Sequence, residues 1–98
     1  MAYFAVTYEY TDSSERRDQH RPEHVRFLAG LHEERRLLVS GPVDGGARAL
    51  LVLAGESAEQ VAGVLDGDPF HREGLIARRD ITAWNVFFGA DRLAAVTA

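Results

Sequence analysis

Residues Tyr3–Tyr10, which read YFAVTYEY, decide the fold that we expect for this chain. Aromatic and β-branched residues dominate the stretch, and this composition is typical of a β-strand. Because apolar residues fall on both faces of such a strand, we expect it to lie in the interior of a sheet. The polar run from Thr11 to Gln19 that follows is interpreted as a loop or as the frayed entry to a helix.

The next segment has the pattern of an amphipathic helix whose first turn contains Pro22. Proline suits that position, because the N–H that it lacks would have no intrahelical partner there. Val25, Leu28 and Leu31 then recur at helical spacing. This spacing predicts one apolar face and one charged face.

A second strand and a hairpin are predicted downstream. The second strand begins at Leu37–Val39, and Ser40-Gly41-Pro42 interrupts it. Proline cannot donate to a sheet ladder, so the strand must be exposed there or must end. The turn residues Asp44-Gly45-Gly46 then lead into the apolar run Ala49–Ala54 (ALLVLA), which predicts a buried hairpin strand.

The last third of the chain predicts one more helix and one more strand. Ser57 and Gln60 have the spacing of a capping box, which opens a helix over residues 58–65. A compact corner over residues 66–74 holds Asp68-Pro69-Phe70. Alternation over residues 76–88 predicts a long final strand, and the residues after Gly89 are expected to form a short tail.

The order of these elements defines the predicted fold class. It is α+β and ferredoxin-like, βαββαβ, with a four-stranded antiparallel sheet that carries two helices on one face. We expect residues 1–98 to form a single domain. The strands look apolar on both sides, so the bare face is expected to pack against a second copy in a homodimer. The alternative is a monomer with an exposed apolar patch.

Composition narrows the possible functions. The net charge of −4 disfavours nucleic acid and anionic membranes as partners. The 11 lysine-or-arginine positions are all arginine. The chain has no cysteine, which excludes disulfides and thiolate chemistry. No apolar run approaches the ~20 residues of a membrane span, and no signal peptide is visible. A cytoplasmic protein without a cofactor is therefore expected.

His24 and Asp68 are the candidates for chemistry. An imidazole held by a carboxylate can act as a general acid–base, which is worth about 10²–10⁴-fold in rate. Two other interpretations stay open, because His24 could be a surface histidine at a helix start and Asp68 could serve only a turn. Whether the two side chains meet is not evident from the sequence.

Other residues around this pair are weaker candidates. Ser40 and the backbone at Gly41-Pro42 could bind an oxygen atom, or could simply end a strand. His20 and His24 stand at i and i+4, but Pro22 separates them and no third ligand completes a set. We therefore expect no metal site.

The order and spacing of these motifs resemble those of the YCII-related (YciI-like) proteins. The motifs, which span nearly the whole chain, are Arg21-x-x-His24, Leu28, Leu31, Ser40-Gly41-Pro42, Asp68-Pro69-Phe70, Gly74-Leu75 and Ile81-x-x-Trp84-Asn85. The resemblance implies a ferredoxin-like chain that pairs as a dimeric α/β barrel, similar to muconolactone isomerases. It also implies a histidine–aspartate pair at the functional site, which falls on His24 and Asp68.

One branch of that family is linked to dehydrochlorination of chlorinated hydroxyhydroquinones, which implies a small carbonyl, enol or phenolic substrate. We expect His24 to transfer the proton and Asp68 to orient the His24 imidazole. Arg21 would neutralise an anionic group or pair with a surface acid, while Phe70 and Trp84 would form apolar walls. The alternatives are a non-catalytic barrel that binds a metabolite, or a structural dimer without a ligand.

Overall fold

A four-stranded antiparallel sheet organises the chain, in the strand order β2-β3-β1-β4. The computed structural model describes residues 1–97. Its strands are β1 (Ala2–Tyr10), β2 (Leu37–Val43), β3 (Arg48–Gly55) and β4 (Ile76–Trp84). The helices are α1 (Ser14–Glu33), α2 (Ala58–Leu65), α3 (Pro69–Arg72) and α4 (Ala90–Thr97), with a 3-10 turn η1 (Asp44–Gly46) between β2 and β3.

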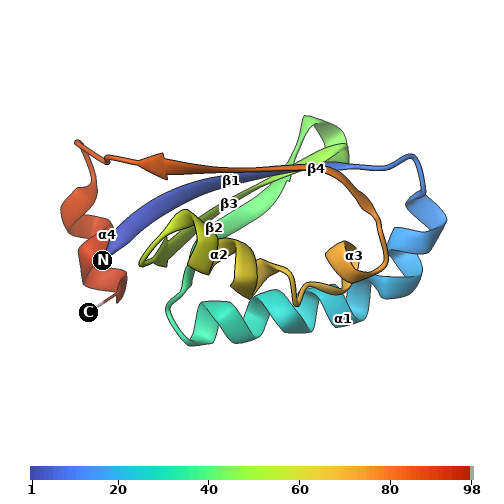
Figure 1. Cartoon of the computed structure of the whole chain (residues 1–98), viewed down its shortest axis with the longest axis horizontal. Helices are drawn as coiled ribbons and strands as arrows, with labels where there is room; N and C mark the ends of the chain where they lie inside the picture. Colours follow the sequence, from blue (N-terminus) through green and yellow to red (C-terminus); the bar gives the residue numbers. More distant parts are fainter. Residues whose placement is uncertain (98) are drawn as a thin grey trace.

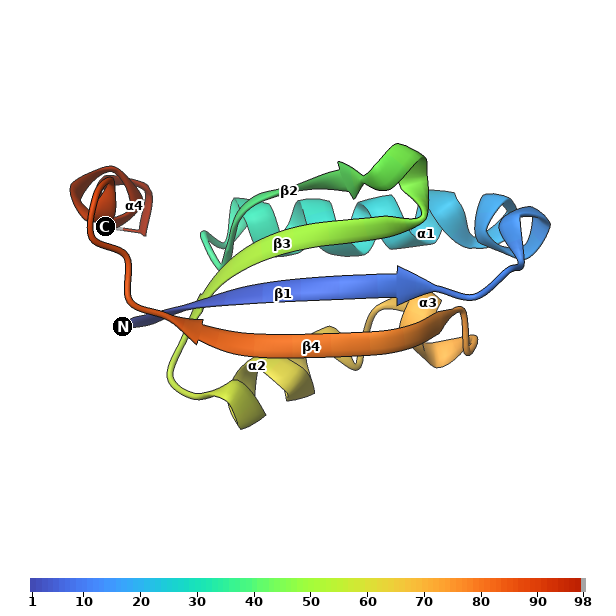
Figure 2. The ribbon, with the colours of Figure 1, turned by 90° about the horizontal axis from the view of Figure 1, so that it is seen from above.

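The helices α1, α2 and α3 all lie on one side of the sheet, whereas α4 lies beyond its end (Figure 1). Figure 2 shows that α1 runs beneath β2 and β3 and that α2 runs beneath β4. This is the predicted α+β, ferredoxin-like arrangement, and the prediction is confirmed. The short helix α3 is an addition within the predicted corner. Within the residues described, no helix is both long and apolar enough to cross a bilayer.

The core lies between the sheet and the helices. Alternate residues of β1 point into it, so Phe4, Val6 and Tyr8 are buried. Val6 pairs with Leu51 of β3 and with Ile81 of β4, which aligns the core-facing positions of three strands. Burial of each large apolar side chain contributes about 1.5–3 kcal/mol, so this register is strongly favoured over a slip by one residue.

No helix formed by residues 1–97 covers the opposite face of the sheet (Figure 1). Its centre is apolar, because Ala5 pairs with Val52 and Val52 pairs with Val39. Val39 and Leu50 remain 58% and 41% exposed. A charged pair, Arg78–Asp80, lies on the same face on β4. The face therefore combines an apolar centre with both signs of charge.

Helix α1 begins earlier than the sequence predicted. It starts at Ser14, so the polar run through Gln19 is helical and Pro22 lies inside the helix. Pro22 is exposed, so water can satisfy the carbonyl that loses its intrahelical donor. The prediction failed because the first turns of α1 are mostly exposed and lack an apolar stripe. His24 is consequently about three turns from the helix N-terminus rather than in the first turn.

Strand β2 also continues where an interruption was predicted. It runs through Ser40, Gly41 and Pro42 to Val43, and Pro42 pairs with Ala49. The strand order makes β2 an edge strand, where a residue without an N–H is tolerated. The second half of β2, residues 40–43, therefore remains paired with β3 as part of the sheet.

The C-terminal prediction was wrong in two respects. Strand β4 ends at Trp84 rather than at residue 88, and residues 90–97 form α4 rather than a tail. Gly89, with a φ of +100°, turns the chain, and its carbonyl accepts the first helical hydrogen bonds from Arg92 and Leu93. Alanine is abundant in this segment, and its high helix propensity explains the helix.

The predicted second helix is confirmed over residues 58–65. Ser57 Oγ accepts a hydrogen bond from the Gln60 N–H at 3.1 Å, as the capping-box spacing predicted. The Gln60 side chain reaches back to the Glu56 N–H at 3.1 Å. This helix leads directly into the corner that carries Asp68.

Candidate functional site

His24 and Asp68 meet in the interior, although 44 positions separate them in the sequence. The His24 Nδ1 atom lies 2.8 Å from Asp68 Oδ1. His24 comes from the middle of α1, and Asp68 is the N-cap of α3. Helices α1 and α3 pack against each other, and an Arg72–Glu23 ion pair of 3.1 Å joins their surfaces. The packing of these two helices therefore sets the geometry of the pair.

Asp68 is fully buried and accepts three hydrogen bonds. Besides His24, its partners are the Phe70 N–H at 2.9 Å and the Tyr8 hydroxyl at 3.3 Å. The Phe70 N–H belongs to the first turn of α3, so the same carboxylate caps that helix. Buried charge is stable only when it is well hydrogen-bonded, and this carboxylate meets that condition. Its position is fixed from three directions.

The carboxylate also determines which nitrogen of His24 carries the proton. An ionised carboxylate only accepts hydrogen bonds, so the Nδ1 atom of His24 must donate. In the neutral ring, Nε2 is then left with a free lone pair. Among the described residues, Nε2 has no hydrogen-bond partner, and the ring borders a pocket. The arrangement presents a base to that pocket.

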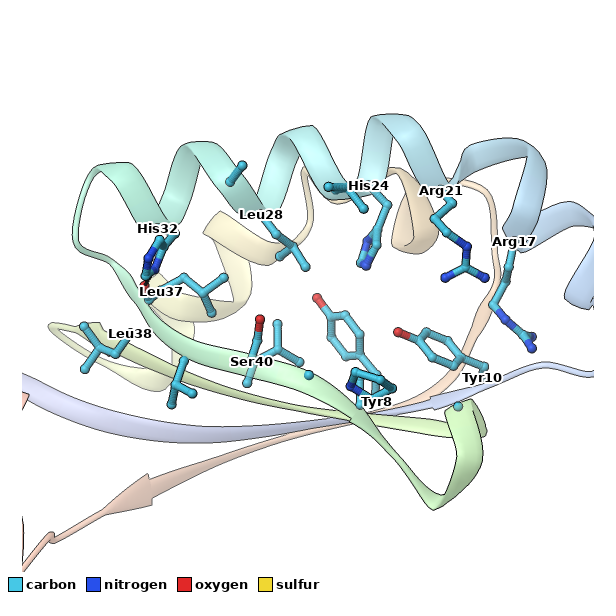
Figure 3. Close-up of a pocket in the computed structure, with 18 of the residues that line it drawn as sticks. Tyr8, Tyr10, Arg17, Arg21, His24, Leu28, His32, Leu37, Leu38 and Ser40 are labelled. Atoms are coloured by element: carbon cyan, nitrogen blue, oxygen red, sulfur yellow. Dashed lines mark hydrogen bonds between the residues drawn. The ribbon is translucent and has the colours of Figure 1, made fainter.

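Phe70 holds the imidazole from its other side. The two rings are stacked, with 3.9 Å between their centroids and 5° between their planes. Phe70 is buried and does not line the pocket, so the prediction that it forms a pocket wall was wrong. Phe70 instead packs against the His24 ring and supports it from the side of α3. Figure 3 shows the His24 ring extending from α1 toward the space above Tyr8.

The pocket lies between α1 and the β2 side of the sheet and has a volume of about 870 Å³ (Figure 3). Its middle is apolar, with Leu28 above and Leu37 and Leu51 below. Its polar groups gather near Tyr8, at the end where His24 lies (Figure 3). A pocket of this size is large enough for a small organic molecule.

The structure brings most of the predicted binding residues to this pocket. Arg21, Ser40, Gly41 and Pro42 all line it. In Figure 3 the Ser40 hydroxyl points into the space between the sheet and α1. Ser40 lies on the inner face because it pairs with the core residue Leu51.

Trp84 is the exception. It pairs with Tyr3 at the end of β4, on the face of the sheet opposite to the core residues. Trp84 is 46% exposed and does not line the pocket, so the prediction that it forms a wall was wrong. Alternation of side chains along β4 explains the error, because Ile81 faces the core and a residue three positions later faces outward.

The sequence analysis missed four polar or charged side chains that line the pocket: Tyr8, Tyr10, Arg17 and His32. The alternation in β1 was a usable signal, since it puts both tyrosines on the face of Val6. Arg17 fell in the run that was interpreted as a loop or a frayed helix entry, which hid its position one helical turn before Arg21. The Nδ1 atom of His32 lies 2.8 Å from the Leu37 carbonyl oxygen, at the far end of the pocket.

The two tyrosines remain neutral hydroxyl donors over an unusually wide pH range. Burial raises the pKa of Tyr8 well above its ordinary value of 10.0, and the charge of Asp68 and the hydrogen bond to it act in the same direction. Burial and Asp68 also raise the pKa of Tyr10, although Arg17 and Arg21 partly oppose the shift. Both hydroxyls are thus suited to donate hydrogen bonds.

Metal ligation is not supported by the arrangement of the acidic and histidine side chains. Within residues 1–97, no three such side chains gather in a way that could hold an ion. His24 is hydrogen-bonded to Asp68, while His20 lies 3.8 Å from Glu73. The two histidines at i and i+4 therefore face different partners.

Together, the ferredoxin-like sheet and the pocket beside a buried His–Asp pair characterise a small α+β protein whose pocket lies between a helix and the sheet. The YCII-related domain model matches residues 1–85, and the chain belongs to this family. None of the curated proteins compared with the chain matches it.

Two solved structures share the fold. One is a 5-chloro-2-hydroxyhydroquinone dehydrochlorinase from Burkholderia phenoliruptrix AC1100, in complex with 2,5-dihydroxybenzoquinone. It is 22% identical, with a TM-score of 0.75, over 87% of this chain and 95% of that one. The other is an uncharacterized NIPSNAP domain protein from Burkholderia xenovorans, 15% identical with a TM-score of 0.50, over 90% of this chain and 96% of that one.

Proposed function

We propose that this protein is a small-molecule enzyme in which His24 performs general acid–base chemistry and Asp68 positions it. The observation that carries the proposal is the 2.8 Å contact between His24 Nδ1 and a fully buried carboxylate. That contact leaves Nε2 as the base that borders the pocket. Such a pair, backed by the stacked Phe70 ring, has little freedom to reorient.

The reaction is a proton transfer on a small carbonyl, enol or phenolic substrate. Nε2 accepts the proton from a carbon next to a carbonyl group. The electron pair of the broken C–H bond forms a C=C bond, and the π pair of the C=O bond moves to the oxygen. The products of this step are an enolate and an imidazolium. Return of the proton to another carbon completes an isomerisation, and expulsion of an anionic leaving group by the enolate completes an elimination.

Groups on β1 and β2 suit the oxygen that becomes negative. The Ser40 hydroxyl faces the pocket and the raised pKa of Tyr8 keeps its hydroxyl protonated, so either can donate a hydrogen bond. Donors that are already oriented stabilise developing charge at little reorganisation cost. Arg21 adds positive charge at the same end of the pocket.

The structural likeness supports the choice of substrate class. The dehydrochlorinase with the same fold acts on a hydroquinone, and its structure holds a dihydroxybenzoquinone. Both compounds are small rings with adjacent enol or phenol oxygens. We propose a substrate of this class for the present protein, in a pocket whose apolar middle suits a planar ring.

The test is hydrogen–deuterium exchange at carbon, followed by NMR in D₂O on hydroquinones and cyclic 1,3-diketones. The wild-type protein should accelerate exchange of at least one of these probes. His24→Ala should reduce that acceleration by about 10²–10⁴-fold. Free imidazole should partly restore it, because the substitution leaves a ring-sized space between Asp68 and the pocket.

His71→Ala is the matched control, since His71 lies outside the pocket and 3.4 Å from the exposed residue Asp66. It should exchange the probes at the wild-type rate. Unchanged exchange in a folded His24→Ala protein would refute the proposed role. Binding of the probes without any accelerated exchange would instead identify a metabolite-binding module, which is the alternative function.

We also propose that the working form is a homodimer. The bare face of the sheet has an apolar centre at Val39, Leu50 and Val52, and the Arg78–Asp80 pair lies on the same face. A two-fold interface places the same surface on both partners, so a face with both signs of charge can complement itself. A second copy would cover the apolar centre and complete a dimeric α/β barrel.

A further inference from the structure

Arg17 is a cation at the polar end of the pocket that lacks an acidic partner. Its guanidinium donates a hydrogen bond to the Thr11 carbonyl oxygen. Its Cζ atom also lies 4.9 Å from the centroid of the Tyr10 ring. Across residues 1–97, no carboxylate oxygen comes within 4.0 Å of the Arg17 nitrogen atoms. The positive charge is thus held in place without being neutralised.

Arg21, the neighbouring cation on the same helix face, differs in this respect. Its NH2 atom lies 3.0 Å from Asp18 Oδ1, so part of its charge is already compensated. Both arginines line the pocket, and Figure 3 shows them extending from α1 at the end of the pocket where Tyr10 lies. Of the two, Arg17 has the greater capacity to bind an additional anion.

The position of Arg17 relative to His24 limits what the anion can belong to. One face of α1 lines the pocket with Arg17, Arg21, His24 and Leu28. Along the helix, this face carries two cations, then the imidazole, then an apolar side chain. Seven residues separate Arg17 from His24, which corresponds to about 10 Å along the axis. An arginine side chain can cover several ångströms of this distance. An anionic group bound there can therefore belong to the same small molecule that His24 contacts.

We propose that Arg17 is the principal anion-binding residue of the pocket, and that the substrate carries a planar oxyanion, such as a carboxylate, beyond its reacting carbon. This inference rests on the proposed function for the reaction, but it concerns binding and can be tested separately. Arg21 assists, and the apolar end near Leu28 takes the hydrocarbon part of the ligand.

The shape of the Arg17 site favours a planar oxygen acid over other anions. A guanidinium presents its N–H donors in a flat fork that matches the two oxygens of a carboxylate. The Arg17 Cζ atom lies over the Tyr10 ring, and the Thr11 carbonyl oxygen accepts a hydrogen bond from one of the Arg17 N–H groups. The remaining N–H groups lie in the plane, so an anion must approach edge-on, as a carboxylate does.

Benzoate and benzamide form a suitable pair of probes, because they have nearly the same shape and differ in charge. Their affinities for the full-length protein can be measured by titration, with backbone amide shifts followed by NMR. We expect wild type to bind benzoate at least tenfold more tightly than benzamide, with an advantage that shrinks as salt is added. Arg17→Gln should weaken benzoate binding by about tenfold to a hundredfold and leave benzamide binding unchanged.

Two further variants control for the fold and for nonspecific charge. Arg17→Lys keeps the charge but not the fork, so benzoate affinity should fall between those of wild type and Arg17→Gln. Arg16→Gln removes the adjacent positive charge, which pairs with Glu73 outside the pocket at 3.8 Å. This variant should bind benzoate with the wild-type affinity. Circular dichroism should show the same helix content in all variants.

Equal affinities of wild type for benzoate and benzamide would overturn the inference, as would the absence of benzoate binding at millimolar concentrations. Equal loss in Arg16→Gln and Arg17→Gln would also overturn it, because only the overall charge would then matter. The proposed chemistry has a different signature. Benzoate binding that survives in His24→Ala, with proton exchange lost, would separate the two roles.

Discussion

The imidazole of His24 lies parallel to the phenyl ring of Phe70, with centroids 3.9 Å apart and planes inclined by 5°. Tyr10 meets the same phenyl ring edge-on, at 5.6 Å and 90°. Phe70 therefore connects the base to the aromatic residues below it, and it belongs to the same short helix that Asp68 caps. The orientation of His24 depends on α3 both through a hydrogen bond and through stacking.

Replacing Phe70 by leucine should disturb both stability and proton transfer. A buried aromatic ring that becomes a smaller side chain leaves a partial cavity, so the free energy of unfolding should fall by about 1–3 kcal/mol. Exchange catalysed by His24 should slow, because the ring loses its stacked support. Urea unfolding and the deuterium-exchange assay measure the two effects.

Phe88→Leu provides the comparison for this substitution, because Phe88 is 98% exposed. Its unfolding free energy should remain within about 0.5 kcal/mol of the wild-type value. A Phe70→Leu protein with wild-type exchange rates would show that stacking is not needed to orient the imidazole.

Asp68→Asn preserves the shape of the side chain but removes its charge. The neutral amide no longer forces the His24 Nδ1 atom to be the donor, so the proportion of rings with a free Nε2 should fall. We expect exchange to slow by at least about a hundredfold, while the cap of α3 is largely retained, because asparagine caps a helix about as well as aspartate does. Nitrogen chemical shifts of the imidazole should reveal the change of tautomer. Unaltered shifts and rates would contradict the positioning role of Asp68.

Tyr8 should make the stability of the protein sensitive to alkaline pH. Burial, followed by the charge of Asp68 and the hydrogen bond to it, raises the pKa of Tyr8 above its ordinary value of 10.0. The folded state then holds the phenolic proton more tightly than the unfolded state does. The corresponding stability is fully present below pH 10 and is lost as pH rises above it toward the folded-state pKa.

Urea unfolding at a series of pH values above 10 tests this expectation. The decline of the wild-type unfolding free energy should be steeper than that of Tyr8→Phe, by up to about 1.4 kcal/mol per pH unit. Tyr10→Phe should reduce the slope as well, because the pKa of Tyr10 is also raised by burial. Parallel curves for wild type and Tyr8→Phe would show that the Tyr8 hydroxyl does not hold its proton more tightly in the folded state.

The proposed homodimer predicts a mass of twice 10.8 kDa in solution. Light scattering at micromolar concentration should give this value for wild type. Leu50→Asp, on the bare face of the sheet, should shift the protein to the monomer. Glu59→Lys, on the exposed surface of α2, is the charge-changing control and should remain dimeric. A wild-type monomer would contradict the proposal.

The sequence predicted those features of the fold that arise from local patterns. The aromatic and β-branched composition of residues 3–10 identified β1, and the Ser57–Gln60 spacing located α2, because both signals lie within a few residues. The start of α1 was missed, since its polar first turns show no apolar periodicity. Helix α4 was missed because the alternation of β4 was extended past Trp84 to Phe88.

The candidate site was predictable only in part, for a physical reason. Resemblance to the family indicated His24 and Asp68, but their contact depends on how α3 packs against α1. Tyr8 and Arg17 were not identified, because their importance comes from neighbours that are distant in sequence or from an element assigned as a loop. Trp84 does not reach the pocket because it lies three residues after the core-facing Ile81, so its side chain points to the opposite face of the sheet.

Asp68 has two roles, and this affects how an aspartate at the same position in related chains should be interpreted. One carboxylate both caps α3 and holds the base, so a descendant that abandoned chemistry would still need it to keep the corner folded. An aspartate at this position is thus expected to persist for the sake of the fold even where the proposed chemistry is absent. His24 does not cap a helix, so its loss in a related chain would indicate that the proposed chemistry has been lost.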